Sequence, residues 1–440
     1  MDTIDTRTGI YAARRARLAA RMKQGVAVVA TAPECMRNRD AAYPYRFDSY
    51  FYYLTGFTEP DAVLVLTAGE GSKSILFCRD KDVEREIWDG YRYGPDGARS
   101  VFGFDDAYSI AELDERMPGL LADQPVLHCM LGADHAWDAR VVGWLNRVRE
   151  QARAGIAAPT EVRELSAAID EMRLVKDEHE LAIMRRAGAI SAAAHVRAMR
   201  TVRPGMPEYR VEAELLHEFR AHGAQAPAYT SIVAGGANAC VLHYVQNDAV
   251  LDDGDLLLID AACELDGYAS DITRTFPVNG RFSAAQKDVY ELVLAAQAAA
   301  IAEVAPGKRW NDPHDAAVRV LAQGLIDLRL IEGSLDKVLE TGAYRRFYMH
   351  RTGHWLGLDV HDAGDYKRDG EWRVLEPGMV LTVEPGCYIR AADDVPQALR
   401  NIGIRIEDDV AVTEAGCEVL TAGVPKQVSE IESLMQAAHE

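Results

Sequence analysis

Short apolar runs punctuated by turn residues dominate the first third of the chain. They occur at 26–32, 50–56, 62–69 and 73–78 and predict β-strands, and a Gly69–Gly71 turn joins the last two into a hairpin. Helical periodicity follows near 110–123 and 135–153, with a strand expected at 125–132. This pattern predicts a mixed α/β first domain.

A small, Gly- and Pro-containing segment at 154–160 separates that domain from a long helical pattern at about 165–200. We place the domain boundary between about 155 and 175 and assign the domains 1–170 and 171–440. Further helices are expected from Pro207 to Gly223, at 284–304 and at 313–329, and the spacing of Ser283 and Gln286 is that of a capping box. Strands are expected at 229–234, 240–245, 256–276, 379–384 and 400–413. Helix pairs that alternate with antiparallel strands predict an α+β fold with helices on one side of a curved sheet.

The run LLLIDAACELDGYASDITRTF at 256–276 predicts a β-hairpin that carries Asp260 and Asp271. With Leu265-Asp266 as a two-residue loop, the two aspartates lie directly opposite each other; with Asp266-Gly267, they are diagonal neighbours on one face. Either register brings their Cβ atoms within roughly 5 to 8 Å, where two carboxylates need a shared proton or a cation. A three-residue loop would put them on opposite faces. The structural alternative is a surface hairpin with two solvated aspartates.

Further candidates come later in the chain. His350, His354 and His361 lie among glycines in HRTGHWLGLDVHD, which favours a loop that leads into a strand. Glu384 ends an apolar strand before Pro385-Gly386. In GIRIEDDVAVT, alternation puts Arg405 and Glu407 on one strand face, as an ion pair or as a ligand with its supporting partner.

Taken together, two aspartates, two glutamates and one imidazole form a donor set suited to a pair of divalent cations about 3.5–4 Å apart. An oxygen-rich shell favours Mn²⁺, with Co²⁺, Fe²⁺ and Zn²⁺ as alternatives.

The formal net charge of −20 opposes binding to nucleic acid. Seven cysteines without a CxxC pair fit reduced thiols in the cytoplasm. No apolar run approaches the ~20 residues that a membrane span needs, so no membrane insertion is expected.

The order Asp260, Asp271, His354, Glu384 and Glu407, within HWLGLDVHD, VEPG and GIRIEDD, resembles the pita-bread dinuclear metallopeptidases. More closely, the chain is similar to the bacterial Xaa-Pro aminopeptidases, the aminopeptidase P family. FYYLTGFTEPDAVLVL at 51–66 extends this similarity into the first domain.

The resemblance implies a mixed α/β N-terminal domain for oligomerisation and substrate access, followed by a pita-bread catalytic domain. It implies that Asp260 is a terminal metal ligand, that Asp271 and Glu407 bridge two metals, and that His354 and Glu384 complete the shell. A hydroxide activated by both metals would attack the peptide, and Glu384 would carry its proton to the leaving nitrogen. The resemblance also implies that His243 and His361 hydrogen-bond the substrate and stabilise the tetrahedral intermediate. It implies a proline subsite formed by His350, Val360 and Arg405. Asp40 and Trp88 would contact substrate across a subunit interface.

Together, the residues and the resemblance predict a cytoplasmic hydrolase that releases the N-terminal residue of peptides with proline in second position. The resemblance also implies a homo-oligomer, dimeric or tetrameric. The alternative enzyme is a prolidase, which cleaves only Xaa-Pro dipeptides. The alternative from another class is a metal-free pita-bread binding module, and retention of all five ligand positions argues against it.

Overall fold

The computed structural model describes residues 4–438. The chain divides into two compact units, Met1–Met172 and Arg173–Glu440. None of the helices in the described part of the chain has the length and apolar character that crossing a membrane requires.

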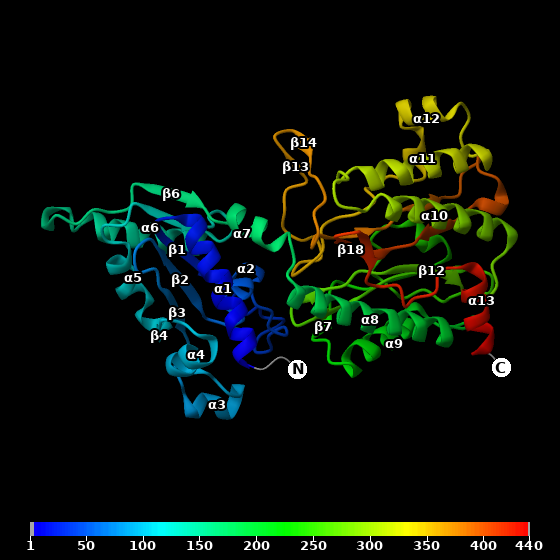
Figure 1. Ribbon diagram of the computed structural model, residues 1–440. Helices are drawn as coiled ribbons and strands as arrows, with labels where there is room; N and C mark the ends of the chain where they lie inside the picture. The colour runs from blue at the N-terminus through cyan, green and yellow to red at the C-terminus, as the bar shows by residue number, and fades with distance from the viewer. Residues whose placement is uncertain (1–3, 439–440) are drawn as a thin grey trace. The chain divides into compact units, whose positions relative to one another are not determined.

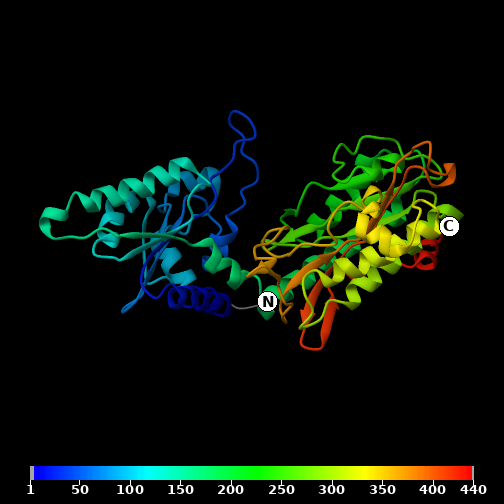
Figure 2. The ribbon, with the colours of Figure 1, turned by 90° about the horizontal axis from the view of Figure 1, so that it is seen from above.

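The first unit is built on one mixed six-stranded sheet in the order β4-β3-β2-β1-β5-β6. Figure 2 shows helices α1 and α6 on opposite faces of this sheet. The hairpin expected at 62–78 is confirmed, because β2 and β3 pair antiparallel. The elements are α1 (Ile4–Met22), β1 (Gly25–Ala30), α2 (Ser49–Thr55), β2 (Val63–Ala68), β3 (Ser74–Cys78), α3 (Val83–Asp89), α4 (Gly94–Phe102), β4 (Asp106–Ser109), α5 (Leu113–Leu121), β5 (Val126–Cys129), α6 (His135–Arg149), β6 (Glu161–Glu164) and α7 (Ser166–Arg173).

The strand expected at 50–56 is wrong, because this segment forms helix α2. Asp48 caps the helix by accepting a hydrogen bond from the Phe51 N–H, and Gly56 ends it in the left-handed region. Nearly all of its residues are buried, so its apolar run reflects a buried helix. Periodicity cannot distinguish the two in so short a run.

Two long helix pairs and several short helices make up the helical part of the second unit. The capping box predicted at Ser283 and Gln286 is confirmed by reciprocal hydrogen bonds. The single helical pattern expected at 165–200 is instead two helices, because Asp177 and Glu180 form a capping box that starts a new helix. These helices are α8 (Glu178–Thr201), α9 (Glu208–Ala221), α10 (Ala284–Ala302), α11 (Asp312–Asp327), α12 (Leu335–Thr341) and α13 (Val428–Ala437).

All strand pairings in the described part of the second unit are antiparallel. Figure 1 shows strands such as β12 and β18 between helix α10 on one side and helix α8 on the other. The strands are β7 (Ala226–Pro227), β8 (Ile232–Gly235), β9 (Leu256–Asp260), β10 (Cys263–Leu265), β11 (Tyr268–Ala269), β12 (Thr273–Pro277), β13 (Lys367–Arg368), β14 (Glu371–Trp372), β15 (Val380–Val383), β16 (Gly386–Ile389), β17 (Ile402–Arg405), β18 (Asp408–Thr413) and β19 (Gly416–Val419).

The prediction of a strand at 240–245 is wrong, because Cys240 ends a short 3₁₀ helix (Gly236–Cys240) and 241–245 form a loop. The buried carboxylate of Glu208, the first residue of α9, holds this loop in place with four hydrogen bonds. It accepts two from backbone N–H groups, those of Gly235 (2.8 Å) and Ala249 (3.0 Å). It accepts two more from the side chains of Asn238 (3.1 Å) and Tyr244 (2.8 Å). The apolar side chains of Leu242 and Val245 in this segment line a cavity and do not belong to a sheet. The strand expected at 400–413 is divided into β17 and β18, with Glu407 at the break.

Candidate functional site

The hairpin that carries the two aspartates has the Asp266-Gly267 loop. Leu265 pairs with Tyr268, and Asp266 and Gly267 have φ values of 48° and 82°, as a type I′ turn requires. Asp260 pairs with Thr273, so Asp271 is its diagonal neighbour. The diagonal, same-face alternative is therefore confirmed.

One phenol lies between the two aspartates. The Tyr229 hydroxyl is 2.6 Å from Asp260 Oδ1 and 2.5 Å from Asp271 Oδ1. Burial and the charges of both aspartates raise the pKa of Tyr229 well above its ordinary value, so the phenol keeps its proton. It has only that one proton to donate, and the second carboxylate requires another proton or a cation.

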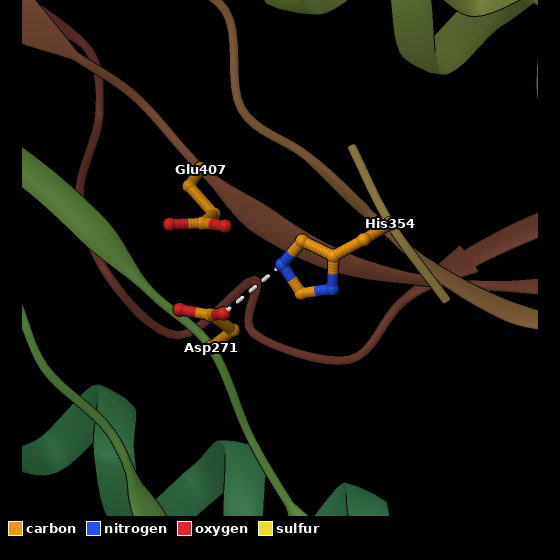
Figure 3. Close-up of side chains that lie close together, drawn as sticks. All are labelled: Asp271, His354 and Glu407. Atoms are coloured by element: carbon orange, nitrogen blue, oxygen red, sulfur yellow. Dashed lines mark ion pairs between the residues drawn. The ribbon is translucent and has the colours of Figure 1, made fainter. Parts of the chain in front are cut away.

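His354, Asp271 and Glu407 form a compact cluster at the same place (Figure 3). Each offers one ligand atom within 4.8 Å of the others, and His354 Nε2 lies 3.4 Å from Asp271 Oδ2 and 3.7 Å from Glu384 Oε1. The other ring nitrogen, Nδ1, contacts the Trp355 carbonyl at 2.9 Å. This contact orients the ring and directs Nε2 toward the acids, as in metal-binding histidines.

The buried acids carry more negative charge than their neighbours neutralise. Burial, together with the charge of Asp260, raises the pKa of Asp271. Burial raises the pKa of Glu384 to about 7, and burial with the surrounding carboxylates raises that of Glu407 well above its usual value. Burial alone would lower the pKa of His354, but the hydrogen bond to Asp271 and the charge of Glu384 raise it to about 9. These side chains fit a divalent-cation site, because a cation would supply the charge that they lack.

Arg405 connects the acids to the rest of the site. It donates hydrogen bonds to Asp260 Oδ2 (2.6 Å), to the Tyr388 hydroxyl (2.9 Å) and to Thr273 Oγ1 (3.1 Å). Thr273 in turn donates to Glu407 Oε2 at 2.6 Å. Arg405 therefore pairs directly with Asp260, and its link to Glu407 runs through Thr273.

A cavity of about 660 Å³ brings the predicted residues together. Its lining includes the five candidate ligands and the five candidate substrate contacts, namely Asp260, Asp271, His354, Glu384 and Glu407 with His243, His350, Val360, His361 and Arg405. Burial lowers the pKa of His350 to about 4, and burial with the charge of His354 lowers that of His361. Both imidazoles are therefore neutral hydrogen-bonding groups near pH 7.

Asp40 and Trp88 belong to the first unit and do not line this cavity. Asp40 is exposed in the segment between β1 and α2, and Trp88 is 83% exposed on α3. Their assignment as contacts across a subunit interface stays a prediction.

Sequence reasoning missed three residues that support the site. Tyr229 contacts both aspartates. The Tyr388 hydroxyl accepts a hydrogen bond from Arg405 and lies 2.9 Å from His350 Nε2, so it connects these two side chains. The buried carboxylate of Asp409 accepts the Asp271 backbone N–H, with both oxygens at 3.1 Å. Asp409 had a visible signal, because it is the last acid of GIRIEDD and directly precedes the apolar run Val410-Ala411-Val412.

Comparison with known proteins identifies the family to which the chain belongs. Residues 182–414 match metallopeptidase family M24, and residues 11–128 match the N-terminal domain of aminopeptidase P. The chain belongs to metallopeptidase family M24 and is an enzyme.

Individual relatives show which members of this family the chain is similar to in sequence and structure. The Xaa-Pro aminopeptidase of Haemophilus influenzae is 46% identical over 96% of both chains. An aminopeptidase structure from Pseudomonas aeruginosa is 53% identical, with a TM-score of 0.97 and 98% of each chain covered. Zinc-substituted aminopeptidase P of Escherichia coli in complex with product is 45% identical, with a TM-score of 0.96, and the match covers 98% of this chain and 99% of that one. Within M24, the chain is a member of the Xaa-Pro aminopeptidases, which hydrolyse the N-terminal Xaa-Pro bond and bind divalent metal. The alternative of a metal-free binding module is not supported.

Proposed function

We propose that this enzyme releases the N-terminal residue of peptides with proline in second position and that five side chains hold two divalent cations for this reaction. Asp260 would be a terminal ligand, Asp271 and Glu407 would be shared by the two cations, and His354 and Glu384 would complete the set of ligands. The observation that carries the proposal is the convergence of these groups on one cavity with too little positive charge around them. When bound, the cations supply Lewis-acid activation of water and of the substrate carbonyl.

The proton-transfer role falls to Glu384. Its carboxylate lines the cavity and lies 3.7 Å from His354 Nε2, so it is placed where a group that accepts a proton from water and returns it would have to be. It carries the proton from the attacking water to the proline nitrogen. That nitrogen has no hydrogen of its own in the peptide and must gain one to leave.

Substrate binding uses the rest of the cavity wall. His350, Val360 and Arg405 form the proline subsite, and His243 and His361 hydrogen-bond the substrate and the tetrahedral intermediate. The neutral state favoured for His350 and His361 supports this, because a neutral imidazole does not repel the nearby cations.

Manganese is our proposed native metal, because the donor set is four carboxylates and one imidazole with no cysteine thiolate. We assign the enzyme to the cytoplasm, since all seven cysteines are free.

A homo-oligomer, dimeric or tetrameric, completes the proposal. Its support is the exposed apolar surface around α3, where Val83, Ile87, Trp88 and Tyr91 are between 67% and 83% exposed. In this assembly Asp40 and Trp88 contact substrate bound to a neighbouring subunit. Light scattering of the wild type and of a Trp88→Ala variant measures the assembly.

The test of the activity uses metal-stripped protein with Mn²⁺, Co²⁺, Fe²⁺ or Zn²⁺ restored one at a time. An Xaa-Pro-Xaa tripeptide is compared with an Xaa-Pro dipeptide, and bound metal is counted by elemental analysis. We expect two metals per chain, highest turnover in Mn²⁺ and preference for the tripeptide; preference for the dipeptide would establish a prolidase. Asp271→Ala should abolish turnover, with the exposed Asp336→Ala as matched control. Full turnover with two metals in Asp271→Ala would contradict the ligand assignment.

A further inference from the structure

One wall of the cavity is aromatic and comes from two segments far apart in sequence. Trp310 and Tyr366 line the cavity with ring centroids 4.6 Å apart, and both pack on the buried Trp355, at 4.1 and 5.7 Å. The β13–β14 hairpin carries the third cavity-lining aromatic residue of this wall, Trp372.

This wall is held in place by backbone and side-chain bonds. The Trp310 N–H donates to the Arg373 carbonyl at 2.8 Å, and the Leu375 N–H donates to the Lys308 carbonyl at 2.7 Å. Arg309 also pairs with Glu371 on β14. The hairpin and the segment before α11 therefore form one preorganised surface beside the site.

Arg351 follows the proposed proline-subsite residue His350 and lies over this wall. Its guanidinium carbon is 5.0 Å from the centroid of the Trp372 ring, and it donates a hydrogen bond to Asn311 Oδ1. Its side chain is exposed and lines the cavity. Stacking on an indole orients a guanidinium and leaves its edge available to a planar anion.

Charge is distributed unevenly in this cavity. Among the described residues that line it, only Arg351 and Arg405 carry a permanent positive charge. Arg405 is 4% exposed and uses its donors on Asp260, Tyr388 and Thr273. A negatively charged group that enters the cavity therefore meets Arg351.

We propose that Arg351, stacked on Trp372, forms a subsite for the C-terminal carboxylate of short substrates, the residue after proline in an Xaa-Pro-Xaa tripeptide. This inference rests on the proposed peptidase function and deepens it by naming the preferred substrate class. The planar fork of arginine matches a carboxylate with two parallel hydrogen bonds. A longer peptide carries a neutral amide at this position and loses the charged interaction.

The experiment compares Ala-Pro-Ala bearing a free carboxylate with the same peptide bearing a C-terminal amide, in saturating Mn²⁺. For the wild type we expect a KM for the acid about two- to fivefold lower than for the amide, with equal kcat, as for a partly solvated charge pair. Arg351→Gln should bring the KM ratio to about one by raising KM for the acid alone, and Arg351→Lys should retain part of the preference. The exposed Arg210→Gln on α9 is the matched control and should keep the wild-type ratio.

A binding measurement separates this inference from the peptidase proposal. Titration calorimetry with Pro-Ala and Pro-Ala amide should show the same preference for the acid, again removed by Arg351→Gln. Equal KM values for acid and amide in the wild type, or an unchanged ratio in Arg351→Gln, would overturn the subsite. Failure to cleave either peptide would contradict the proposed function, and the titration would still decide whether Arg351 binds the carboxylate.

Discussion

A buried ion-pair cluster behind the His361 loop makes a quantitative test of the structure possible. Asp362 is buried and accepts hydrogen bonds from Arg173 (2.6 Å) and Lys176 (2.9 Å), whose side chains are 2% and 1% exposed. Asp362→Ala leaves these two cations buried without their shared partner. Removing one member of a buried pair costs about 3 to 5 kcal/mol of unfolding free energy. For a unit of this size, that corresponds to a fall in Tm on the order of 10 °C.

Asp359, a second acidic partner of Arg173, provides a matched control. Asp359 accepts from Arg173 at 2.7 Å, but its side chain is 43% exposed. Asp359→Ala should therefore cost only about 0 to 1 kcal/mol. Scanning calorimetry and urea unfolding of both variants measure the difference. Equal destabilisation of the two variants, or a loss below about 1 kcal/mol in Asp362→Ala, would refute the reasoning that burial decides the cost.

The same cluster predicts a pH dependence. Burial alone would raise the pKa of Asp362, but the charges of Lys176 and Arg173 outweigh it and hold the pKa below 3.8. A carboxyl group with a lowered folded pKa stabilises the fold fully above its unfolded pKa and loses this contribution as pH falls through the folded value. The stability difference between wild type and Asp362→Asn should therefore stay constant above about pH 5 and shrink in acid.

Three further variants test the support of the metal site. Tyr229→Phe removes the phenol between the aspartates and should weaken metal binding about 10- to 100-fold, measured by competition with a chelator. Asp409→Ala leaves the Asp271 N–H without its acceptor and should lower stability by about 1 to 3 kcal/mol together with metal affinity. Gly353→Ala should disrupt folding or metal binding, because its Cβ would lie 2.0 Å from the Thr382 carbonyl oxygen.

Controls for these variants lie elsewhere in the chain. Gly143→Ala in α6 meets nothing within 4 Å and should stabilise that helix by about 0.5 to 1 kcal/mol. Tyr209→Phe changes an exposed tyrosine on α9 and should leave metal affinity unchanged. Wild-type metal affinity in both Tyr229→Phe and Asp409→Ala would contradict the support that we assign to those side chains.

The local parts of the site could be predicted from sequence because their determinants are close together in the chain. The Asp266-Gly267 turn sets its own register, and alternation then puts Asp260 and Asp271 on one face. The capping box at Ser283 is local in the same way.

Other parts depend on contacts that no local pattern encodes. Tyr229 meets Asp260 and Asp271 across 31 and 42 residues, and Arg405 meets Asp260 across 145. The apolar run at 50–56 is too short for periodicity to separate a buried helix from a strand, and the signals that favour a helix are the residues that flank it, Asp48 as N-cap and Gly56 as C-cap. Similarly, the 240–245 segment is kept out of a strand by Glu208, which precedes it by more than thirty residues.

The turn at Asp266-Gly267 also limits how this protein can change in length. Most surface connections tolerate an inserted residue because only the loop adjusts. One residue added between β10 and β11 would move Asp271 to the opposite face of its strand or force a bulge that absorbs the shift. A single insertion or deletion at this turn should therefore abolish metal binding wherever no bulge absorbs it, while paired ones preserve the parity of the two strands.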